Sequence, residues 1–314
     1  MCTSGLAKAI PDKLPPTLHS IHRILFLGDS ITYSGQYIEY LDAFLASRYP
    51  NARIELINVG LPSETVSGLS EPGHAGGAFP RPDLHERLDR ALEKTKPDMV
   101  VACYGMNDGI YFPLSEERFA KYREGMTKLV DKVKAAGAKF LILTPPVFDP
   151  EPIRANTLPA GLDAYPKPYV GYDEVLTAYS KWLLLQRSKG WRVADLHGPM
   201  RKYLDAKRID QPGYRLADDG VHANAIGHRI MAEAVRNVLK VGKPIEPDDE
   251  SGWTSNSTIL KLSQERQRLL KDAWLTEIGH TRPGMATGLP LSEALARAEE
   301  LDKQIRALAR AKNP

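Results

Sequence analysis

The sequence predicts an α/β fold in which a mainly parallel β-sheet of five strands is covered by helices on both faces. Its 314 residues suit one large α/β domain with an appendage. Short apolar segments alternate with segments whose apolar residues recur at helical spacing. The short segments are apolar along their whole length, which is typical of strands buried on both faces of a parallel sheet.

The elements follow one another in a regular order. Strands are expected in residues 23–27, 54–59, 99–104, 140–144 and 191–196. Helices are expected in residues 37–47, 84–92, 119–135 and 175–185, and a last helix of the body should follow residue 222. Because ligands of such sheets bind outside the carboxyl ends of the strands, we look for functional residues directly after each strand.

Two connections and the C-terminal part do not follow this alternation of strands and helices. Residues 60–82 and 145–171 are long for α/β loops, and either they are plain surface loops or they form walls of a binding cleft. The apolar stripe of residues 291–308 is expected to pack on the body, with a homo-oligomer contact as the alternative. The expected organisation is an N-terminal extension (1–22), the body (23–241), a proline-containing linker (242–256) and a C-terminal helical extension (257–314).

Composition excludes several classes of function. The formal net charge is only +3, without a dense basic block, so no nucleic-acid partner is expected. Cys2 and Cys103 are too few for a disulfide framework, and the histidines show no metal-ligand spacing, so neither a metal nor another cofactor is expected. No apolar run approaches the roughly 20 residues that a membrane span needs.

A serine and a histidine lie where nucleophilic chemistry is expected. Gly28-Asp29-Ser30 directly follows the first strand, and Asp219-Gly220-Val221-His222 precedes the last helix of the body. A serine hydroxyl becomes a good nucleophile when an imidazole takes its proton, and a carboxylate holds that imidazole in the right tautomer. Spacing favours Asp219 as this carboxylate, with Asp218 as the alternative. Taken singly, Ser30 and His222 could be simple helix caps.

Two further blocks offer hydrogen-bond donors for a negatively charged intermediate. Asn58-Val59-Gly60 and Gly105-Met106-Asn107-Asp108 each follow a strand. Acyl transfer needs donors aimed at the oxyanion of a tetrahedral intermediate, and backbone N–H groups or an asparagine amide can supply them. Either block alone could also be ordinary turn chemistry.

The order of these four blocks resembles the SGNH hydrolases, also called the GDSL esterase and lipase family. The resemblance covers about residues 23–240 and implies a flavodoxin-like three-layer α/β/α sandwich. It also implies that Ser30 is the nucleophile, His222 the base and Asp219 its orienting carboxylate. The oxyanion donors would be the N–H groups of Ser30 and Gly60 and the side chain of Asn107. We add Asp29, His74 and Asp108 as candidate substrate contacts.

The expected function is hydrolysis of a short acyl ester, acetyl above all, on a carbohydrate or another small alcohol. The long loops offer Tyr, Phe and Gly, which suit a sugar ring, and no strongly apolar lid is evident. The alternatives are a lipase, thioesterase or lysophospholipase on the same triad, and a carbohydrate-binding protein without catalysis. The resemblance favours a secreted or periplasmic location, with the leader absent from this chain.

Overall fold

The sheet has five parallel strands in the order β2-β1-β3-β4-β5. The computed structural model describes residues 14–254 and 256–311. The first strand, β1, lies between β2 and β3, and Leu25 is in register with Ile57 of β2 on one side and Val100 of β3 on the other. The strands are β1 (Arg23–Gly28), β2 (Glu55–Asn58), β3 (Met99–Cys103), β4 (Lys139–Leu143) and β5 (Val193–Ala194).

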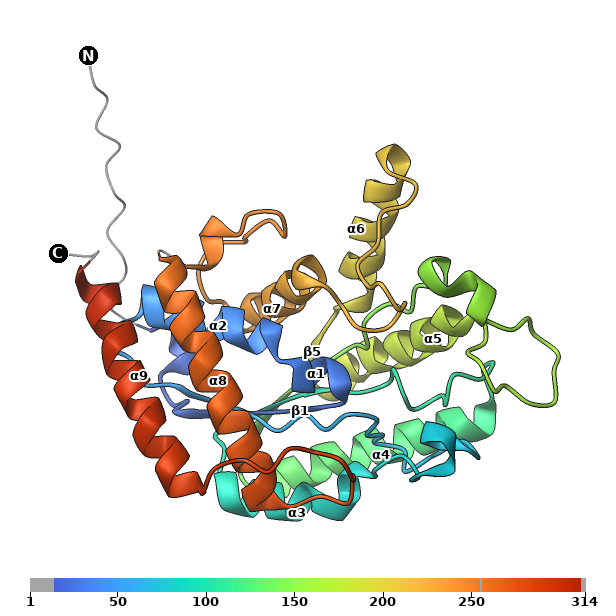
Figure 1. Cartoon of the computed structure of the whole chain (residues 1–314), viewed down its shortest axis with the longest axis horizontal. Coiled ribbons are helices and arrows are strands. Elements are labelled where there is room, and N and C mark those ends of the chain that lie inside the picture. Colours follow the sequence, from blue (N-terminus) through green and yellow to red (C-terminus); the bar gives the residue numbers. More distant parts are fainter. Residues whose placement is uncertain (1–13, 255, 312–314) are drawn as a thin grey trace.

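Helices cover both faces of the sheet, so the predicted three-layer α/β/α architecture is confirmed (Figure 1). One layer holds α2 and α7, which pack on each other; the other holds α3, α4 and α5, with Tyr122 of α4 stacked on Tyr179 of α5. The helices are α1 (Ser30–Ser34), α2 (Gln36–Arg48), α3 (Leu84–Thr95), α4 (Glu116–Ala135), α5 (Tyr172–Leu185), α6 (His197–Asp210), α7 (Ala225–Leu239), α8 (Ser257–Ile278) and α9 (Leu291–Ala311). Short 3₁₀ turns are η1 (Pro16–Leu18), η2 (His74–Gly77), η3 (Glu151–Asn156), η4 (Gln186–Lys189) and η5 (Ser251–Trp253).

The elements agree with the sequence pattern except near β5. Every residue of β3 is buried, as a strand covered on both faces requires. The expected strand at residues 191–196 is shorter, because only Val193 and Ala194 pair with β4. Helix α6 was not expected, since Gly198 and Pro199 suggest a turn, and the helix projects from the body (Figure 1).

Helices α8 and α9 pack against the α/β body, along α2 and the edge strand β2 (Figure 1). Arg266 of α8 is buried and forms ion pairs with Asp42 of α2 and Asp302 of α9. In the stripe of α9, Ala298 and Ile305 are buried, whereas Leu295 is 40% exposed. The helical extension and the body therefore share buried charges, and oligomer formation through these helices stays a prediction.

Membrane-spanning helices and metal-binding clusters were not expected from the sequence. In that part of the chain, no helix is long and apolar enough to cross a membrane. Nor does the described part contain a cluster of three or more His, Cys, Asp or Glu side chains that could hold a metal ion. Cys103 is a buried free thiol in β3, and Cys2 lies outside the described residues.

Candidate active site

Ser30 begins α1 directly after β1, at the carboxyl edge of the sheet. The preceding Asp29 caps this short helix, because its side chain accepts a hydrogen bond from the N–H of Ile31 at 2.9 Å. The turn is too tight for a larger residue at position 28. A Cβ on Gly28 would lie 2.2 Å from Oγ1 of Thr32 and 2.8 Å from the carbonyl oxygen of Cys103. Glycine here lets the chain turn sharply from strand to helix and leaves Ser30 at the sheet edge.

His222 joins Ser30 to Asp219 through two hydrogen bonds. The distance between Oγ of Ser30 and Nε2 of His222 is 2.7 Å, and Nδ1 of His222 lies 2.6 Å from Oδ2 of Asp219. A carboxylate only accepts, so Nδ1 carries the proton, and Nε2 of the neutral ring accepts from the serine hydroxyl. Residues 192 positions apart in the sequence are thus brought into one hydrogen-bonded chain.

Asp219 is also held by the turn that contains it. Its Oδ1 accepts hydrogen bonds from the N–H groups of Val221 and His222. Partial burial opposes ionisation of Asp219, but the hydrogen bonds from His222 and from these backbone groups hold its pKa below the usual range. Asp218, the alternative carboxylate, forms an ion pair with Arg215 at 3.2 Å. The carboxylate that contacts His222 in this structure is therefore Asp219.

The imidazole and its carboxylate stand open to solvent. The side chain of His222 is 50% exposed and that of Asp219 is 54% exposed. The turn between Asp219 and His222 is fixed by a backbone hydrogen bond, because the N–H of Asp149 donates to the carbonyl oxygen of Gly220 at 2.9 Å. Gly220 has φ 75°, and a Cβ there would lie 2.3 Å from the carbonyl oxygen of Asp149. Only glycine satisfies both requirements.

Gly60 packs against the helix that begins with Ser30. A Cβ at position 60 would lie 2.4 Å from the backbone nitrogen of Tyr33. The N–H of Gly60 donates to Oδ1 of Asn58 at 2.9 Å, while Nδ2 of Asn58 donates to the carbonyl oxygen of Thr32 at 2.8 Å. Asn58 therefore ties the loop at Gly60 to α1, and an oxyanion at Gly60 would share or replace this amide contact.

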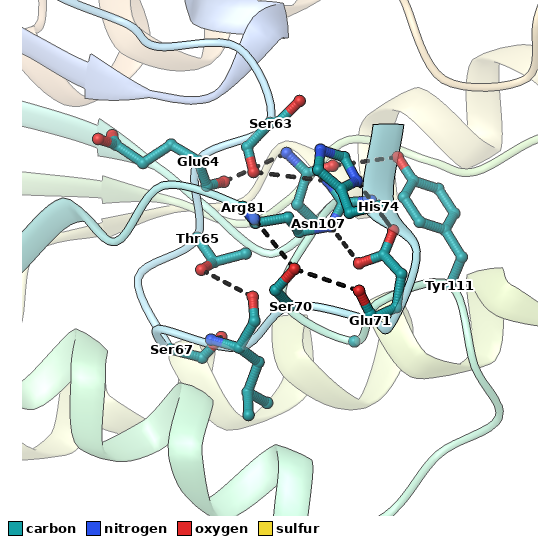
Figure 2. Close-up of polar contacts among 12 residues, drawn as sticks. Ser63, Glu64, Thr65, Ser67, Ser70, Glu71, His74, Arg81, Asn107 and Tyr111 are labelled. Carbon is teal, nitrogen blue, oxygen red and sulfur yellow. Dashed lines mark hydrogen bonds and ion pairs between the residues drawn. The ribbon is translucent and has the colours of Figure 1, made fainter. Parts of the chain in front are cut away.

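The side chain of Asn107 is buried and lies among the side chains of Arg81 and Tyr111 (Figure 2). Its Nδ2 donates to the carbonyl oxygen of Glu64 at 3.2 Å, and its Oδ1 accepts a hydrogen bond from the hydroxyl of Tyr111, also at 3.2 Å. Glu64 is itself fixed by a buried network, because its carboxylate accepts from the guanidinium of Arg87 and the hydroxyl of Tyr104. The amide of Asn107 is therefore held from both ends.

These geometric findings can be compared with known proteins. A model of the GDSL-like Lipase/Acylhydrolase family matches residues 26–230. The chain belongs to the GDSL-like lipase/acylhydrolase family. It is accordingly a carboxylic ester hydrolase, and the matched residues include Ser30, Gly60, Asn107, Asp219 and His222. A search of curated proteins found no match.

Solved structures of low sequence identity share the fold of this family member. A gut microbial diltiazem-metabolizing enzyme is 19% identical over 70% of this chain, with a TM-score of 0.53, and the match spans 47% of that enzyme's chain. A catalytic mutant of Axe2, an acetylxylan esterase from Geobacillus stearothermophilus, is 20% identical over 70% of this chain and 95% of its own, with a TM-score of 0.52. Another Axe2 mutant, described as an acetyl-xylooligosaccharide esterase, is 20% identical over 72% and 97%, with a TM-score of 0.51.

The three candidate substrate contacts have different surroundings. Asp29 and Asp108 are 3% and 0% exposed. Burial raises the pKa of Asp29 to about 7 and that of Asp108 to about 6. One oxygen of Asp108 accepts from the N–H groups of Val66 and Ser67. Both carboxyls thus shape the loops around Ser30 and Asn107, and a direct substrate contact by either stays a prediction.

His74 lies in η2 beside an ion pair that sequence reasoning missed (Figure 2). Its Nδ1 is 3.1 Å from the carboxylate of Glu71, which also pairs with Arg81 at 2.6 Å. Burial and the nearby Arg81 hold the pKa of His74 below its usual value. Glu71 and Arg81 flank the glycine-rich loop in the sequence, but no local motif indicates that they pair there.

A cavity lined largely by charged residues lies near the site, on the side of Asp149. It has a volume of about 550 Å³ and lies between α5 and α6, beside the turn that holds Asp219. Ser30 and His222 do not line it. Its lining includes paired charges and one lysine: Asp149 with Arg208, Asp173 with Arg201, and Lys181.

Proposed function

We propose that this member of the family is a serine esterase in which Ser30, His222 and Asp219 form the catalytic triad. The observation that carries the proposal is the hydrogen-bonded chain from Oγ of Ser30 through His222 to Asp219, at 2.7 and 2.6 Å. Nε2 of His222 takes the hydroxyl proton as Oγ attacks the ester carbonyl. Asp219 stabilises the imidazolium that results.

The reaction then proceeds through an acyl-enzyme. The tetrahedral intermediate collapses, His222 gives its proton to the leaving alcohol, and the acyl group remains on Ser30. Water attacks this ester while His222 takes a proton from the water. As the acid leaves, His222 gives this proton to Oγ of Ser30, which restores the serine hydroxyl. The N–H groups of Ser30 and Gly60 and Nδ2 of Asn107 are the proposed oxyanion donors.

The proposed substrates carry a short acyl group, with acetyl preferred, on a carbohydrate or a similar polar alcohol. Large exposed hydrophobic side chains in the described residues lie outside the segments that carry the site: Leu114, Leu162, Leu185, Ile209 and Leu295. A long acyl chain would therefore find little apolar surface beside Ser30, whereas charged side chains line the cavity near Asp149 and can bind the hydroxyl groups of a polar alcohol. The fold neighbours described as acetylxylan and acetyl-xylooligosaccharide esterases support the same substrate class.

The direct test is hydrolysis of p-nitrophenyl esters from acetyl to palmitoyl by the wild type and by Ser30→Ala. We expect the highest kcat/KM on acetyl, a steady fall with chain length and loss of turnover in Ser30→Ala. Ser34→Ala is the matched control, because it removes a hydroxyl from the same helix. The hydroxyl of Ser34 forms hydrogen bonds with Ile31 and His228 instead of His222. Equal rates on acetyl and palmitoyl esters would contradict the substrate assignment and favour a lipase.

A second experiment distinguishes an esterase from a carbohydrate-binding protein without catalysis. Acetylated xylo-oligosaccharides would be offered to the wild type, and both released acetate and bound oligosaccharide would be measured. Release of acetate that depends on Ser30 supports the esterase. Tight binding of the oligosaccharide without release of acetate would contradict the proposed reaction.

A further inference from the structure

The orientation of the Asn107 amide is set by what surrounds it. The carbonyl oxygen of Glu64 can only accept, so the amide atom that faces it at 3.2 Å must be Nδ2. The other amide atom is then Oδ1, and the hydroxyl of Tyr111 must donate to it, also at 3.2 Å. Nδ2 has two hydrogens and Glu64 takes one, which leaves the second for an oxyanion.

The ring of Tyr111 packs against two neighbouring side chains. The ring of Tyr172 stacks on it with centroids 4.9 Å apart, and the guanidinium carbon of Arg81 lies 5.4 Å from its centroid. Arg81 is in turn held by Glu71, whose two carboxylate oxygens accept from Nε and Nη2 at 2.6 and 2.7 Å (Figure 2). The side chain of Arg81 is only 6% exposed, so its contacts with Glu71 and Tyr111 are largely shielded from solvent.

The backbone at Tyr111 adopts a conformation that L-residues rarely take. Ile110 has φ 50° and Tyr111 has φ 59°, two consecutive non-glycine residues in the left-handed region. A β-branched residue such as Ile110 is especially unfavourable there, and strain of this kind persists where surrounding structure imposes it. The carbonyl oxygen of Tyr111 accepts from the N–H of Tyr169 at 2.8 Å, which helps to fix the turn.

We propose that Tyr111 is a positioning residue that holds the Asn107 carboxamide with its free Nδ2 hydrogen toward the oxyanion, and that the Glu71–Arg81 pair holds Tyr111. The inference rests on the proposed esterase function and on the assignment of Asn107 as an oxyanion donor. Tyr111 acts only through Asn107 and forms no bond to the substrate. Burial raises the pKa of the Tyr111 phenol, so its hydroxyl stays protonated and able to donate at assay pH.

The first test is Tyr111→Phe, which keeps the stacked ring and removes the hydroxyl. With p-nitrophenyl acetate we expect kcat to fall roughly three- to tenfold, the scale of one lost hydrogen bond, while KM changes less than about twofold. Tyr122→Phe is the matched control. Its buried hydroxyl donates to the carbonyl oxygen of Tyr104 rather than to Asn107, so its kcat should stay near that of the wild type.

The decisive test is the same substitution in an Asn107→Ala background. If Tyr111 acts through Asn107, adding Tyr111→Phe changes the residual kcat by less than about twofold. An equal loss in both backgrounds, or an unchanged kcat in the single variant, would overturn the inference. Glu71→Gln weakens the pair with Arg81 and leaves the Tyr111 hydroxyl in place. We expect a smaller fall in kcat for this variant, and no fall when it is made in the Asn107→Ala background.

The outcome can be separated from that of the proposed function. Ser30→Ala, assayed in parallel, reports on the nucleophile alone. If Ser30→Ala is inactive while Tyr111→Phe keeps the wild-type kcat, the esterase assignment stands and the positioning role fails. If Ser30→Ala keeps full turnover, the esterase mechanism itself fails. Thermal unfolding of each variant shows whether a lost activity reflects loss of the folded protein.

Discussion

Replacing Asp219 with asparagine should slow catalysis while leaving the turn around it intact. Oδ1 of an asparagine at this position can still accept from the N–H groups of Val221 and His222. Its amide nitrogen would replace Oδ2, the atom that now lies 2.6 Å from Nδ1 of His222. Two donors would then face each other, so the imidazole would lose both its preferred tautomer and the carboxylate that stabilises its charged form.

The size of this effect follows from the exposure of the pair. Two unit charges about 4 Å apart interact by about 1 kcal/mol in water and by about 4 kcal/mol at the effective dielectric constant of a protein surface. Since both side chains are about half exposed, an intermediate value of about 2 kcal/mol is expected, which is roughly thirtyfold in rate. This loss is smaller than that expected for a fully buried pair.

The assay is kcat on p-nitrophenyl acetate for Asp219→Asn, with Asp218→Asn as control. Asp218 directly precedes Asp219 and pairs with Arg215, so loss of its negative charge should leave kcat within about twofold of the wild type. If Asp219→Asn retained full kcat, or if Asp218→Asn were equally damaging, the assignment of the orienting carboxylate would be refuted.

Three further predictions concern the oxyanion donors, the buried carboxyl and the C-terminal helices. Asn107→Ala should lower kcat about a hundredfold or more, with KM little changed, in steady-state assays; near-native turnover would exclude it as an oxyanion donor. Burial raises the pKa of Asp29 to about 7, above its unfolded value, so its neutral form is favoured in the folded state and stability decreases as pH rises through about 4 to 7. Asp29→Asn should therefore become more stable relative to the wild type by roughly 1 kcal/mol per pH unit across that window in urea titrations, and a constant difference would contradict the raised pKa. Asp42→Ala leaves the buried Arg266 with one partner fewer and should cost about 3–5 kcal/mol of unfolding free energy, measured by urea denaturation; a change below about 1 kcal/mol would show that α8 is not anchored through this pair.

The fold could be predicted from the sequence because each strand and most helices carry their own periodic signal. Met99 to Cys103 are apolar throughout and form a strand buried on both faces, and the helical spacing after Ser115 gives α4. Helix α6 escaped prediction because Gly198 and Pro199 near its start are turn-forming residues, and because most of its residues are not buried. A projecting helix with little apolar surface leaves little periodic signal in the sequence.

The site could be predicted only in part, for a related physical reason. Ser30, Asp219 and His222 follow strand ends or precede a helix, so the topology of a parallel sheet itself indicates that they meet. The cluster of Glu71, Arg81 and Tyr111 depends on how the long loop of residues 60–82 packs against the connection between β3 and α4. No periodicity encodes such packing, and the left-handed backbone at Ile110 and Tyr111 occurs at residues whose side chains disfavour it.

If Ser30 is the nucleophile, it carries the acyl group during turnover, and mass spectrometry of the protein after a rapid acid quench can detect that group. The wild type would be mixed with p-nitrophenyl acetate, quenched during the first turnover and digested to locate the modification. We expect one added acetyl group on the peptide that contains Ser30, and none on that peptide in Ser30→Ala. An acetyl group found elsewhere with unmodified Ser30, or continued turnover by Ser30→Ala, would contradict this role of Ser30.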